Sequence, residues 1–362
     1  MQIRASRLRH WAADDRWAPS KIRDALDRQA RVPIGSVRVR KATWEDNDAL
    51  VDLYANSPSD AGEWEVTVER GPFAFAQFAL QDQFEVHVVE DGGELLAALA
   101  HATTTMHAGG IETSVYIPLG WRVRKHCRGE GLGPLLQKGA HKRFGGSDVS
   151  MWYYRRRGSK KARWAEMLCY PARTTSAPSS NIRVADRSDL DACVALINQT
   201  LQHHFDVFPL YDVAYLDAKL DGADREERAK VYGRQDFYVL EEDGAIVACG
   251  GLWDRGRHMR ERWRHKTTGE ERTVQNTALI DFGYAEGRED AMAMLIEHFI
   301  GISAELGRDH LMAPLQFLPE LSSHLGRHQP EKETRAWYWG NSATLRSLGF
   351  MPARPYTDLA YW

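Results

Sequence analysis

The sequence predicts an α/β protein with mixed β-sheets, built from two tandem copies of one domain type. The chain has 362 residues, which is more than one hydrophobic core usually supports. A segment that begins at Val37 also recurs, at one constant offset, in the segment that begins at Ile182. The identical residues are Arg40, Ala42, Asp46, Asp48, Ala49, Val51 and Leu53, matched by Arg183, Ala185, Asp189, Asp191, Ala192, Val194 and Leu196. This internal match indicates a duplication.

The order of the predicted elements repeats as well. Each copy opens with a short strand and an amphipathic helix that starts at an aspartate. A β-hairpin is predicted next, at 84–93 and at 237–244, because each segment contains an Asp-Gly pair that supplies the positive φ of a tight turn. A further strand and a helix follow, and the helices are predicted over 134–144 and 290–306. Each copy therefore reads strand, helix, hairpin, strand, helix.

The domain boundaries follow from the repeat. The stretch at 174–180 is polar and contains a proline, so it cannot bury enough surface to fold alone, and we place the linker there. The predicted domains are 36–173 and 181–362. A surface loop within one large domain is the alternative. Residues 1–35 match neither copy and are predicted to form a helical N-terminal extension.

Composition limits the class of protein. The formal net charge of -3 predicts no general attraction to nucleic acid. The four cysteines lie far apart in the sequence, which suggests neither a zinc site nor a disulfide framework and fits a reducing cytoplasm. No apolar run approaches the roughly 20 residues of a membrane helix, and the first residues do not resemble a secretion signal. We therefore expect a cytoplasmic protein without a membrane segment, a metal or a nucleic-acid partner.

The most informative segment is the glycine-rich stretch at 123–136. It joins an extended run at 111–123 to an amphipathic helix, so a strand runs into a glycine turn and then into a helix N-terminus. Such a turn presents backbone N–H groups and the positive end of a helix dipole, which together bind phosphate. The spacing fits neither a Walker A loop nor a Rossmann fingerprint. Glycines that only end one element and start the next are the alternative.

The segment resembles the pyrophosphate-binding motif of the GNAT acyltransferases, whose common form is V-x-x-x-x-R-G-x-G-[LI]-G. The residues that match this motif position by position are Val123, Arg128, Gly129, Gly131, Leu132 and Gly133. The resemblance covers 36–171 and, more loosely, 181–362. It implies an acyl-CoA ligand, most often acetyl-CoA, with its pyrophosphate on the turn. It also implies that backbone amides near Trp121 and Val123 meet the pantetheine and the thioester carbonyl.

The second copy lacks this motif. Its corresponding stretch, 281–290, has no arginine-led glycine triplet and carries Glu286, Glu289 and Asp290 where a pyrophosphate would lie. These carboxylates would each oppose the ligand by about 1 kcal/mol or more. We therefore expect the second copy to bind no coenzyme A, to support the first copy and to help wall its acceptor cleft.

The catalytic residues are less evident from the sequence. The resemblance implies a closing strand at 149–154 and a closing helix at 158–170, but a proton-donating tyrosine is replaced by Ala165. The usual positions of a carboxylate base hold Ile117 and Tyr153. Catalysis by positioning, with water taking the amine proton, is one option.

The other option assigns those roles to Tyr153, Tyr116 or Glu112, with Tyr153 as first choice or, alternatively, as a core aromatic.

Two further features are open to more than one interpretation. The basic segments 155–161 and 255–272 are solvated loops, or they contact coenzyme A phosphates or an anionic acceptor. His203 and His204 have no partner at metal-ligand spacing, which favours a surface or structural role.

The predicted function is transfer of an acyl group, most often acetyl, from coenzyme A to an amine of a small molecule or peptide, by direct attack in a ternary complex. A tRNA-dependent aminoacyltransferase and a non-catalytic acyl-CoA-binding regulator are the alternatives. The intact motif at 128–133 argues against the first of these. A homodimer is left open.

Overall fold

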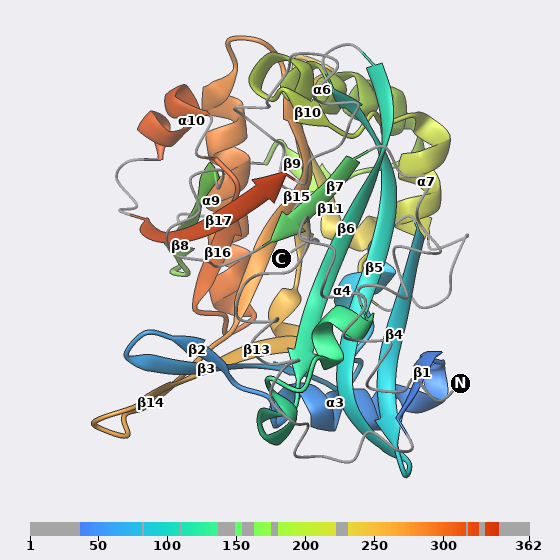
Figure 1. The fold of residues 1–362 in the computed structure, drawn as a ribbon. Helices are drawn as coiled ribbons and strands as arrows, with labels where there is room; N and C mark the ends of the chain where they lie inside the picture. Colours follow the sequence, from blue (N-terminus) through green and yellow to red (C-terminus); the bar gives the residue numbers. More distant parts are fainter. Residues whose placement is uncertain are drawn as a thin grey trace.

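One long mixed sheet runs through the molecule (Figure 1). The computed structural model describes residues 37–81, 83–108, 111–136, 149–153, 163–174, 180–221, 231–315, 318–325 and 330–339. Within them, a 13-stranded sheet has the order β1-β4-β5-β6-β7-β17-β8-β16-β15-β12-β11-β9, with β10 added on β5. The predicted α/β class with mixed strand directions is confirmed.

The first copy supplies the strands at one end of this sheet. Its elements are β1 Arg38–Lys41, η1 Trp44–Asp46, α3 Asn47–Ala55, β2 Ser59–Ala61, β3 Trp64–Arg70, α4 Ala76–Ala79, β4 Gln83–Asp91, β5 Glu94–Ala108, β6 Ile111–Val123, η2 Lys125–Cys127, a helix over 132–136, β7 Val149–Tyr153 and β8 Arg163–Pro171. The long strands β4, β5 and β6 are successive antiparallel neighbours, so this end is a meander.

The second copy repeats the order. Its elements are β9 Ile182–Val184, η3 Arg187–Asp189, α6 Leu190–His204, β10 Val207–Phe208, α7 Val213–Asp221, η4 Arg234–Asp236, β11 Phe237–Glu242, β12 Ala245–Trp253, η5 Arg255–Arg257, β13 Met259–His265, β14 Glu271–Val274, β15 Asn276–Tyr284, α9 Glu289–Glu305, β16 His310–Ala313, α10 Pro319–His324 and β17 Glu331–Trp339. The strand, helix and hairpin predicted to open each copy are present in both.

An ion-pair cluster explains the first identities of the repeat. Both terminal nitrogens of Arg40 donate to the carboxylate of Asp46, at 2.7 and 2.6 Å, and its Nε donates to Glu90 at 2.5 Å. The same carboxylate accepts the backbone N–H of Thr43 at 2.7 Å, just ahead of α3. The guanidinium thus joins the start of the helix to strands β1 and β4, and it holds the pKa of Asp46 below its usual range.

The second copy reproduces this cluster. Arg183 donates to Asp189 at 2.6 and 3.0 Å and to Glu241 at 2.9 Å, and Asp189 accepts the backbone N–H of Asp186 at 2.7 Å. Hydrogen bonds with Arg183 again lower the pKa of Asp189. The identical arginine and aspartate therefore form the same ion pair in both copies.

The two hairpins differ in their turns. In the second copy Asp243 and Gly244 both have positive φ, 50° and 77°, as the Asp-Gly pair predicted. In the first copy Asp91 still belongs to β4, and the two turn residues are Gly92 and Gly93, at 57° and 89°. The Asp-Gly pair predicted the hairpin correctly, but the turn lies one residue later, at Gly92 and Gly93.

The two copies exchange their last strands across the sheet. Strand β8 of the first copy lies between β16 and β17 of the second, and β17 in turn pairs with β7 of the first. The predicted closing helix at 158–170 is therefore wrong over 163–170, which is extended. A short run that is mostly apolar fits a helix or a central strand equally well, and strands 140 or more residues away decide the outcome.

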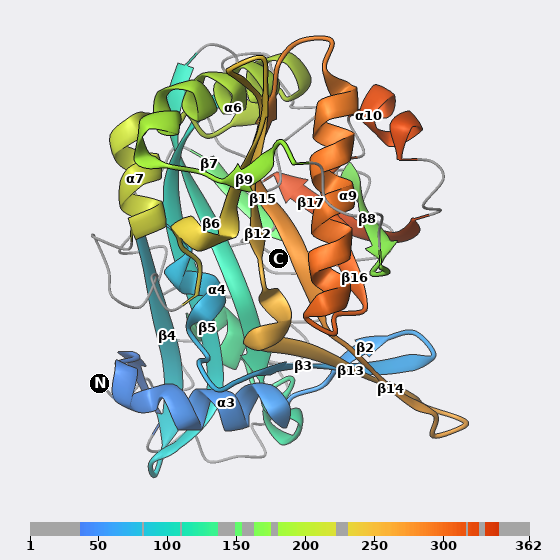
Figure 2. The ribbon, with the colours of Figure 1, turned by 180° about the vertical axis from the view of Figure 1, so that it is seen from behind.

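A smaller sheet also combines the copies. Its order is β14-β13-β3-β2, and β13 pairs along its whole length with β3, from Met259 opposite Arg70 to His265 opposite Trp64. Figures 1 and 2 show it as an arm that projects from the body of the molecule. The basic segment 255–272, for which a solvated loop was one of two interpretations, is η5 followed by most of this hairpin.

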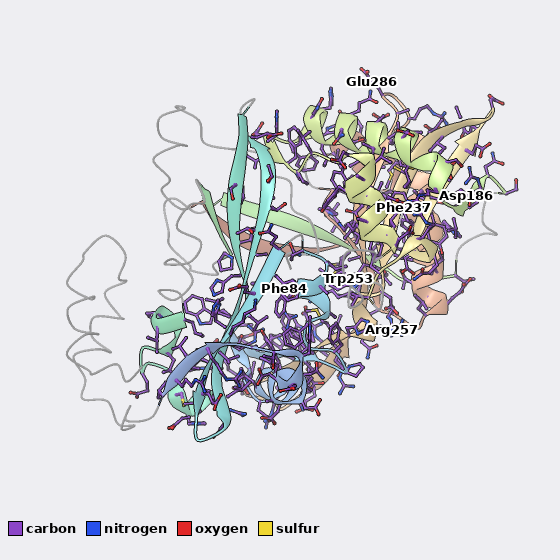
Figure 3. The ribbon with its side chains drawn as sticks, turned by 90° about the vertical axis from the view of Figure 1, so that its right-hand side faces the viewer. Phe84, Asp186, Phe237, Trp253, Arg257 and Glu286 are labelled. Atoms are coloured by element: carbon purple, nitrogen blue, oxygen red, sulfur yellow. The ribbon has the colours of Figure 1, made fainter. Side chains whose placement is uncertain are left out.

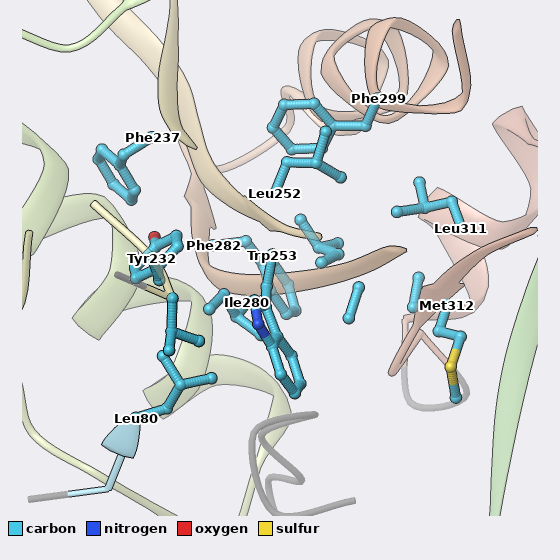
Figure 4. Packing of buried hydrophobic residues seen from close by; sticks show 14 of the residues in the cluster. Leu80, Tyr232, Phe237, Leu252, Trp253, Ile280, Phe282, Phe299, Leu311 and Met312 are labelled. Carbon is cyan, nitrogen blue, oxygen red and sulfur yellow. The ribbon is translucent and has the colours of Figure 1, made fainter. Parts of the chain in front are cut away.

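One hydrophobic core spans both copies. Cys249 of β12 faces α6, where its Sγ lies 3.7 Å from the carbonyl oxygen of Cys193. The neighbouring Gly250 faces α9, since a Cβ there would lie 3.6 Å from Phe299. Because successive strand residues point to opposite faces, α6 and α9 cover opposite faces of this sheet. Figure 3 shows the side chains filling both ends of the molecule, and Figure 4 shows Phe299, Leu252 and Trp253 in the core.

Several sequence predictions lie outside the described residues. These are the N-terminal extension over 1–35, the end of the first glycine-led helix from 137, the basic segment 155–161 and the linker over 175–179.

We expect Arg40→Ala to lower the free energy of unfolding by roughly 1 kcal/mol at pH 7, because the pair is partly exposed. The folded pKa of Asp46 is depressed, so the stabilisation is present above the unfolded pKa and is lost as pH falls through the folded value. Urea unfolding at pH 7 and pH 2 should show a difference between wild type and variant only at the higher pH. An equal difference at both would contradict the ion-pair account.

We expect fragments 1–176 and 177–362, produced separately, to lack cooperative thermal unfolding, because each leaves exchanged strand edges unpaired. When the two fragments are instead co-expressed, they should co-purify and unfold as one cooperative unit. Circular dichroism melts decide the matter, and cooperative unfolding of either fragment alone would count against the interlocked sheet.

Candidate functional site

The glycine turn lies between the end of β6 and the helix at 132–136. Gly129 and Gly131 have φ of 89° and 81°, the left-handed region that L side chains rarely adopt. The turn thus needs glycine at both positions. None of the amides of Gly129, Gly131, Leu132 and Gly133 donates a hydrogen bond to a described residue. They remain available to an anion at the start of the helix.

A small hydrophobic cluster anchors this turn. Cys127, Leu132 and Leu136 pack with strand residues of β4 and β5, and Trp121 and Val123 border them. A Cβ on Gly133 would lie 2.2 Å from the indole of Trp121. Gly133 is therefore required because the helix lies directly against Trp121.

The side chain of Arg128 ties the turn to the end of α3. Its Nε donates to the carbonyl of Val123 at 3.3 Å, and its Nη2 donates to the carbonyl of Pro58. The side chain is otherwise exposed. Arg128 thus positions the turn, and the turn groups left without a described partner are backbone amides.

A β-bulge in β6 precedes the turn. The register between β5 and β6 shifts between Ala98 and Ala100, and Gly120 has a φ of 57°. The buried hydroxyl of Tyr54 donates to the carbonyl of Gly120 at 2.6 Å. Since C=O and N–H of one trans peptide point in opposite directions, the N–H of Trp121 points away from α3. It projects from the face of the sheet that carries the glycine turn.

The amide of Val123 lies on an uncovered strand edge. The N–H of Arg124 donates to Leu96 at 2.9 Å, so Arg124 and Leu96 form a hydrogen-bonded pair. Pairs alternate in an antiparallel ladder, and the N–H of Val123, one residue earlier, therefore points away from β5. Strand β7 pairs with β6 only at Val115 and Tyr116 and covers no more of this edge. Among the described residues, no strand pairs with this edge from the bulge to the turn.

The proposed catalytic residues lie at different distances from the bulge. Tyr116 is the last residue of β6 that pairs with β7, opposite Ser150, and Tyr153 ends β7 opposite Trp337 of β17. Both flank the point where the strands stop pairing. Glu112 is exposed and lies nine residues before Trp121, roughly 30 Å along the strand. The structure does not bring Glu112 to the bulge.

The second copy has the same bulge with different surroundings. Its register shift lies between Cys249 and Gly251, and Asp281, with a φ of 50°, takes the place of Gly120. The carboxylate of Asp281 is fully buried and accepts hydrogen bonds from Lys219 at 2.7 Å and Tyr211 at 2.6 Å. A buried ion pair thus occupies the bulge of the second copy.

Helix α6 also closes the edge that is open in the first copy. The N–H of Tyr284, the counterpart of Val123, donates to Thr200 Oγ1 of α6 at 2.9 Å. A Cβ on Gly283 would lie 2.3 Å from the backbone nitrogen of Ile197, so α6 rests directly on the strand. In the first copy α3 ends at Ala55, before the position equivalent to Thr200.

The connection to the following helix is also shorter in the second copy. Only residues 285–288 separate β15 from α9, and Arg288 pairs with Glu242 at 2.8 Å and with Asp290 at 3.0 Å. The sequence predicted that carboxylates exclude a pyrophosphate here. The structure shows two further obstacles to a pyrophosphate: the glycine turn is missing, and α6 covers the strand edge.

The histidines and cysteines contribute no metal site within the described residues. No cluster of three or more His, Cys, Asp or Glu side chains among them is able to hold a metal ion. His203 is exposed, and the ring of His204 lies 3.1 Å from the hydroxyl of Tyr284. All four cysteines are buried as free thiols. Within the described chain, no helix combines the length and apolar composition needed to cross a bilayer.

Sequence reasoning missed Tyr54. It occupies the buried face of α3, where an aromatic residue is typical of a core. Burial raises the pKa of Tyr54, so the hydroxyl is a neutral donor to Gly120 at ordinary pH. Only the fold of β6 over α3 reveals that contact.

No family model and no curated protein matches the sequence. Solved structures do match the fold. N-myristoyltransferase of Saccharomyces cerevisiae with bound myristoyl-CoA superimposes with a TM-score of 0.61 over 90% of this chain and 83% of that one, at 12% sequence identity. N-myristoyltransferase is a GNAT-fold protein with two GNAT-like halves. The chain has the tandem GNAT fold.

A second GNAT structure matches more weakly. It is the GCN5-related glucosamine N-acetyltransferase region of a fungal multi-domain GH3 beta-N-acetylglucosaminidase, with a TM-score of 0.50 and 14% identity. The match covers 86% of this chain and 38% of that one. At such identities the likeness establishes the GNAT fold, and the chemistry has to be argued from this chain's own residues.

We expect Gly131→Val to weaken coenzyme A binding roughly a hundredfold, because a β-branched residue at a φ of 81° forces the turn amides away from the anion. Isothermal calorimetry measures the dissociation constant.

The matched control is Gly287→Val, which strains a glycine at a φ of 73° in the corresponding connection of the second copy. It should leave the affinity unchanged. Weak binding by the control, or normal binding by Gly131→Val, would place the site in the wrong copy.

Proposed function

We propose that the protein transfers an acyl group, acetyl in the simplest case, from coenzyme A to an amine of a small molecule or peptide. The observation that carries this proposal is the difference between the two copies. In the first, the amides of the glycine turn and of Val123 donate to no residue that the structure describes, whereas the second covers the equivalent edge with α6. The tandem GNAT fold supports a coenzyme A-linked donor.

The first copy's backbone would hold the donor in an extended path. The amides of Gly129 to Gly133 would bind the pyrophosphate, with Arg128 fixing the turn to Pro58. The N–H groups of Trp121 and Val123 would meet the pantetheine and the thioester carbonyl. Amide donors held in place at that carbonyl stabilise the negative charge that develops on its oxygen.

The reaction would proceed by direct attack in a ternary complex. The amine nitrogen bonds to the thioester carbon, the C–S bond breaks, and the sulfur leaves as a thiolate that takes up a proton. The proton lost by the amine passes to water or to a side chain at the strand divergence, where Tyr116 and Tyr153 are the proposed contacts. The position of Glu112 does not support a role for it in this step.

The acceptor is proposed as an amine in the cytoplasm, and no membrane or nucleic-acid partner is invoked. An aminoacyl-tRNA-dependent enzyme would have no use for the open turn at Gly129 to Gly133. A regulator that binds acyl-CoA without turnover is the remaining alternative, and the following experiment separates it from an enzyme.

Calorimetric titration with coenzyme A should give one equivalent per chain. At a hundred times its dissociation constant the ligand should stabilise the fold by about 2.7 kcal/mol. Thiol release from acetyl-, hexanoyl- and myristoyl-CoA should then depend on one class of amine in a panel of amines, amino acids and amino sugars. Two equivalents would contradict a closed second copy, and binding without release from any donor would favour the regulator.

We expect Tyr54→Phe to lower kcat about tenfold while the dissociation constant of coenzyme A stays unchanged. The variant leaves the buried carbonyl of Gly120 without its donor and frees the peptide whose N–H belongs to Trp121.

Tyr211→Phe is the control, since it removes a buried hydroxyl at the bulge of the second copy. Thiol-release assays should give this control the kcat of the wild type. An equal loss of kcat in both variants would mean that the effect of Tyr54→Phe is general destabilisation.

A further inference from the structure

Three arginine side chains meet beside the bulge, on the face of the sheet that packs against α3. Arg70 comes from β3, Arg122 from β6 and Arg255 from η5, and they are named here the arginine cluster. The Cζ atoms of Arg70 and Arg122 lie 4.6 and 5.8 Å from the ring centroid of Tyr54. Arg255 donates to Glu261 of β13, two residues along the strand from Met259, which contacts Arg70. Only 3% of Arg70 and 1% of Arg255 is exposed.

The described part of the chain supplies too little negative charge to balance the cluster. Arg70 donates to the neutral Gln77 and contacts the sulfur of Met259, and Arg122 donates to the carbonyl of its neighbour Trp121 at 2.8 Å. Arg255 donates to Glu261 at 3.0 Å, the one carboxylate that pairs with the cluster among the described residues. Three positive charges and one negative charge leave a net charge of two.

Several of its N–H groups have no partner among the residues that the structure describes. The Nε atoms of Arg70, Arg122 and Arg255 and the Nη1 of Arg255 are buried and donate to none of them. A buried donor without an acceptor is costly, and a buried charge without a counter-charge more so. Burial lowers the pKa of Arg70 to about 10, so the group is still charged at neutral pH. An arrangement of this kind is stable when an anion supplies the missing acceptors.

The cluster lies on the other side of the strand from the glycine turn. Trp121 packs with the small cluster under that turn, whereas Arg122, the next residue, lies over Tyr54 of α3. Successive residues of a strand point to opposite faces. A pyrophosphate on Gly129 to Gly133 therefore leaves the arginine cluster free for another ligand.

We infer that the arginine cluster binds an anionic group, a carboxylate or a phosphate, of the amine acceptor. This inference rests on the proposed acyl transfer and names the acceptor class. Guanidinium groups match both anions with paired hydrogen bonds. The free N–H groups are shielded from solvent, so side-chain movement accompanies binding.

Both copies build this site. Tyr54, Arg70 and Arg122 belong to the first copy, and Arg255 with Glu261 belongs to the second. Met259 opposite Arg70 in the arm sheet holds the two contributions in register. The second copy thus completes the acceptor site although its own donor site is closed.

Paired amines test the inference. Thiol release from acetyl-CoA is measured with β-alanine against β-alaninamide and with O-phosphoethanolamine against ethanolamine. The anionic member of at least one pair should have a kcat/KM higher by roughly tenfold to a hundredfold, as expected for charged hydrogen bonds. Equal values within both pairs overturn the inference.

Variants locate the effect. Arg70→Gln and Arg255→Gln should bring the ratio of anionic to neutral amine close to one, whereas a merely structural loss lowers both rates alike. Arg70→Lys should keep part of the ratio. Arg260→Gln is the control, since Arg260 lies exposed on β13 and pairs with Glu69. A ratio that survives in both glutamine variants overturns the assignment.

Anion binding is also measured without turnover. With coenzyme A saturating, so that the glycine turn is filled, inorganic phosphate should raise the Tm of wild type and of Arg260→Gln but not of Arg70→Gln. If no amine supports thiol release while phosphate still acts through Arg70, the proposed function fails and the anion site stands. Equal phosphate stabilisation of wild type and Arg70→Gln overturns the site itself.

Discussion

The rest of the structure depends on the pairing of β8 with β17. Each strand leaves its own copy and completes the sheet of the other, from Glu331 opposite Cys169 to Trp337 opposite Arg163. Without these two strands the sheet would end at β7 and at β16, and each copy would present open edges. The exchange joins the copies into one sheet and one core, which fixes the arm sheet and the arginine cluster at their junction.

The difference between the copies arises from the length of one helix. Helix α6 continues to His204, and its Thr200 accepts the N–H of Tyr284, whereas α3 ends at Ala55 and no described residue accepts the N–H of Val123. A few helical residues therefore decide which edge is open to a ligand. The buried Lys219–Asp281 pair fills the remaining space at the second bulge. Under the proposed function, the first copy binds the donor and the second serves as a supporting wall.

The junction between the two copies buries positive charge, which is unfavourable. Arg70 and Arg255 are almost fully enclosed, and the Tyr54 ring lies against the guanidinium of Arg70 and near that of Arg122. Cation–π contact offsets part of the desolvation, but it satisfies no N–H group. Protein interiors tolerate such an arrangement where a ligand completes it, since strained or unsatisfied groups concentrate at functional sites. The Tyr54 hydroxyl also donates to the carbonyl of Gly120, so one side chain contacts both the arginine cluster and the bulge.

The sequence by itself determined what local chemistry specifies. Asp243-Gly244 supplied the positive φ of a hairpin, the Arg40 and Asp46 repeat marked the two starts, and the glycines at 129 and 131 marked a turn that L side chains cannot form. Tertiary structure decided the rest. Residues 163–171 form a strand only because partners from the other copy pair with them, and Tyr54 reads as core until β6 folds over it. Arg70 and Arg255 stand 185 residues apart, and no local pattern brings distant charges together, because their proximity results from the pairing of β3 with β13.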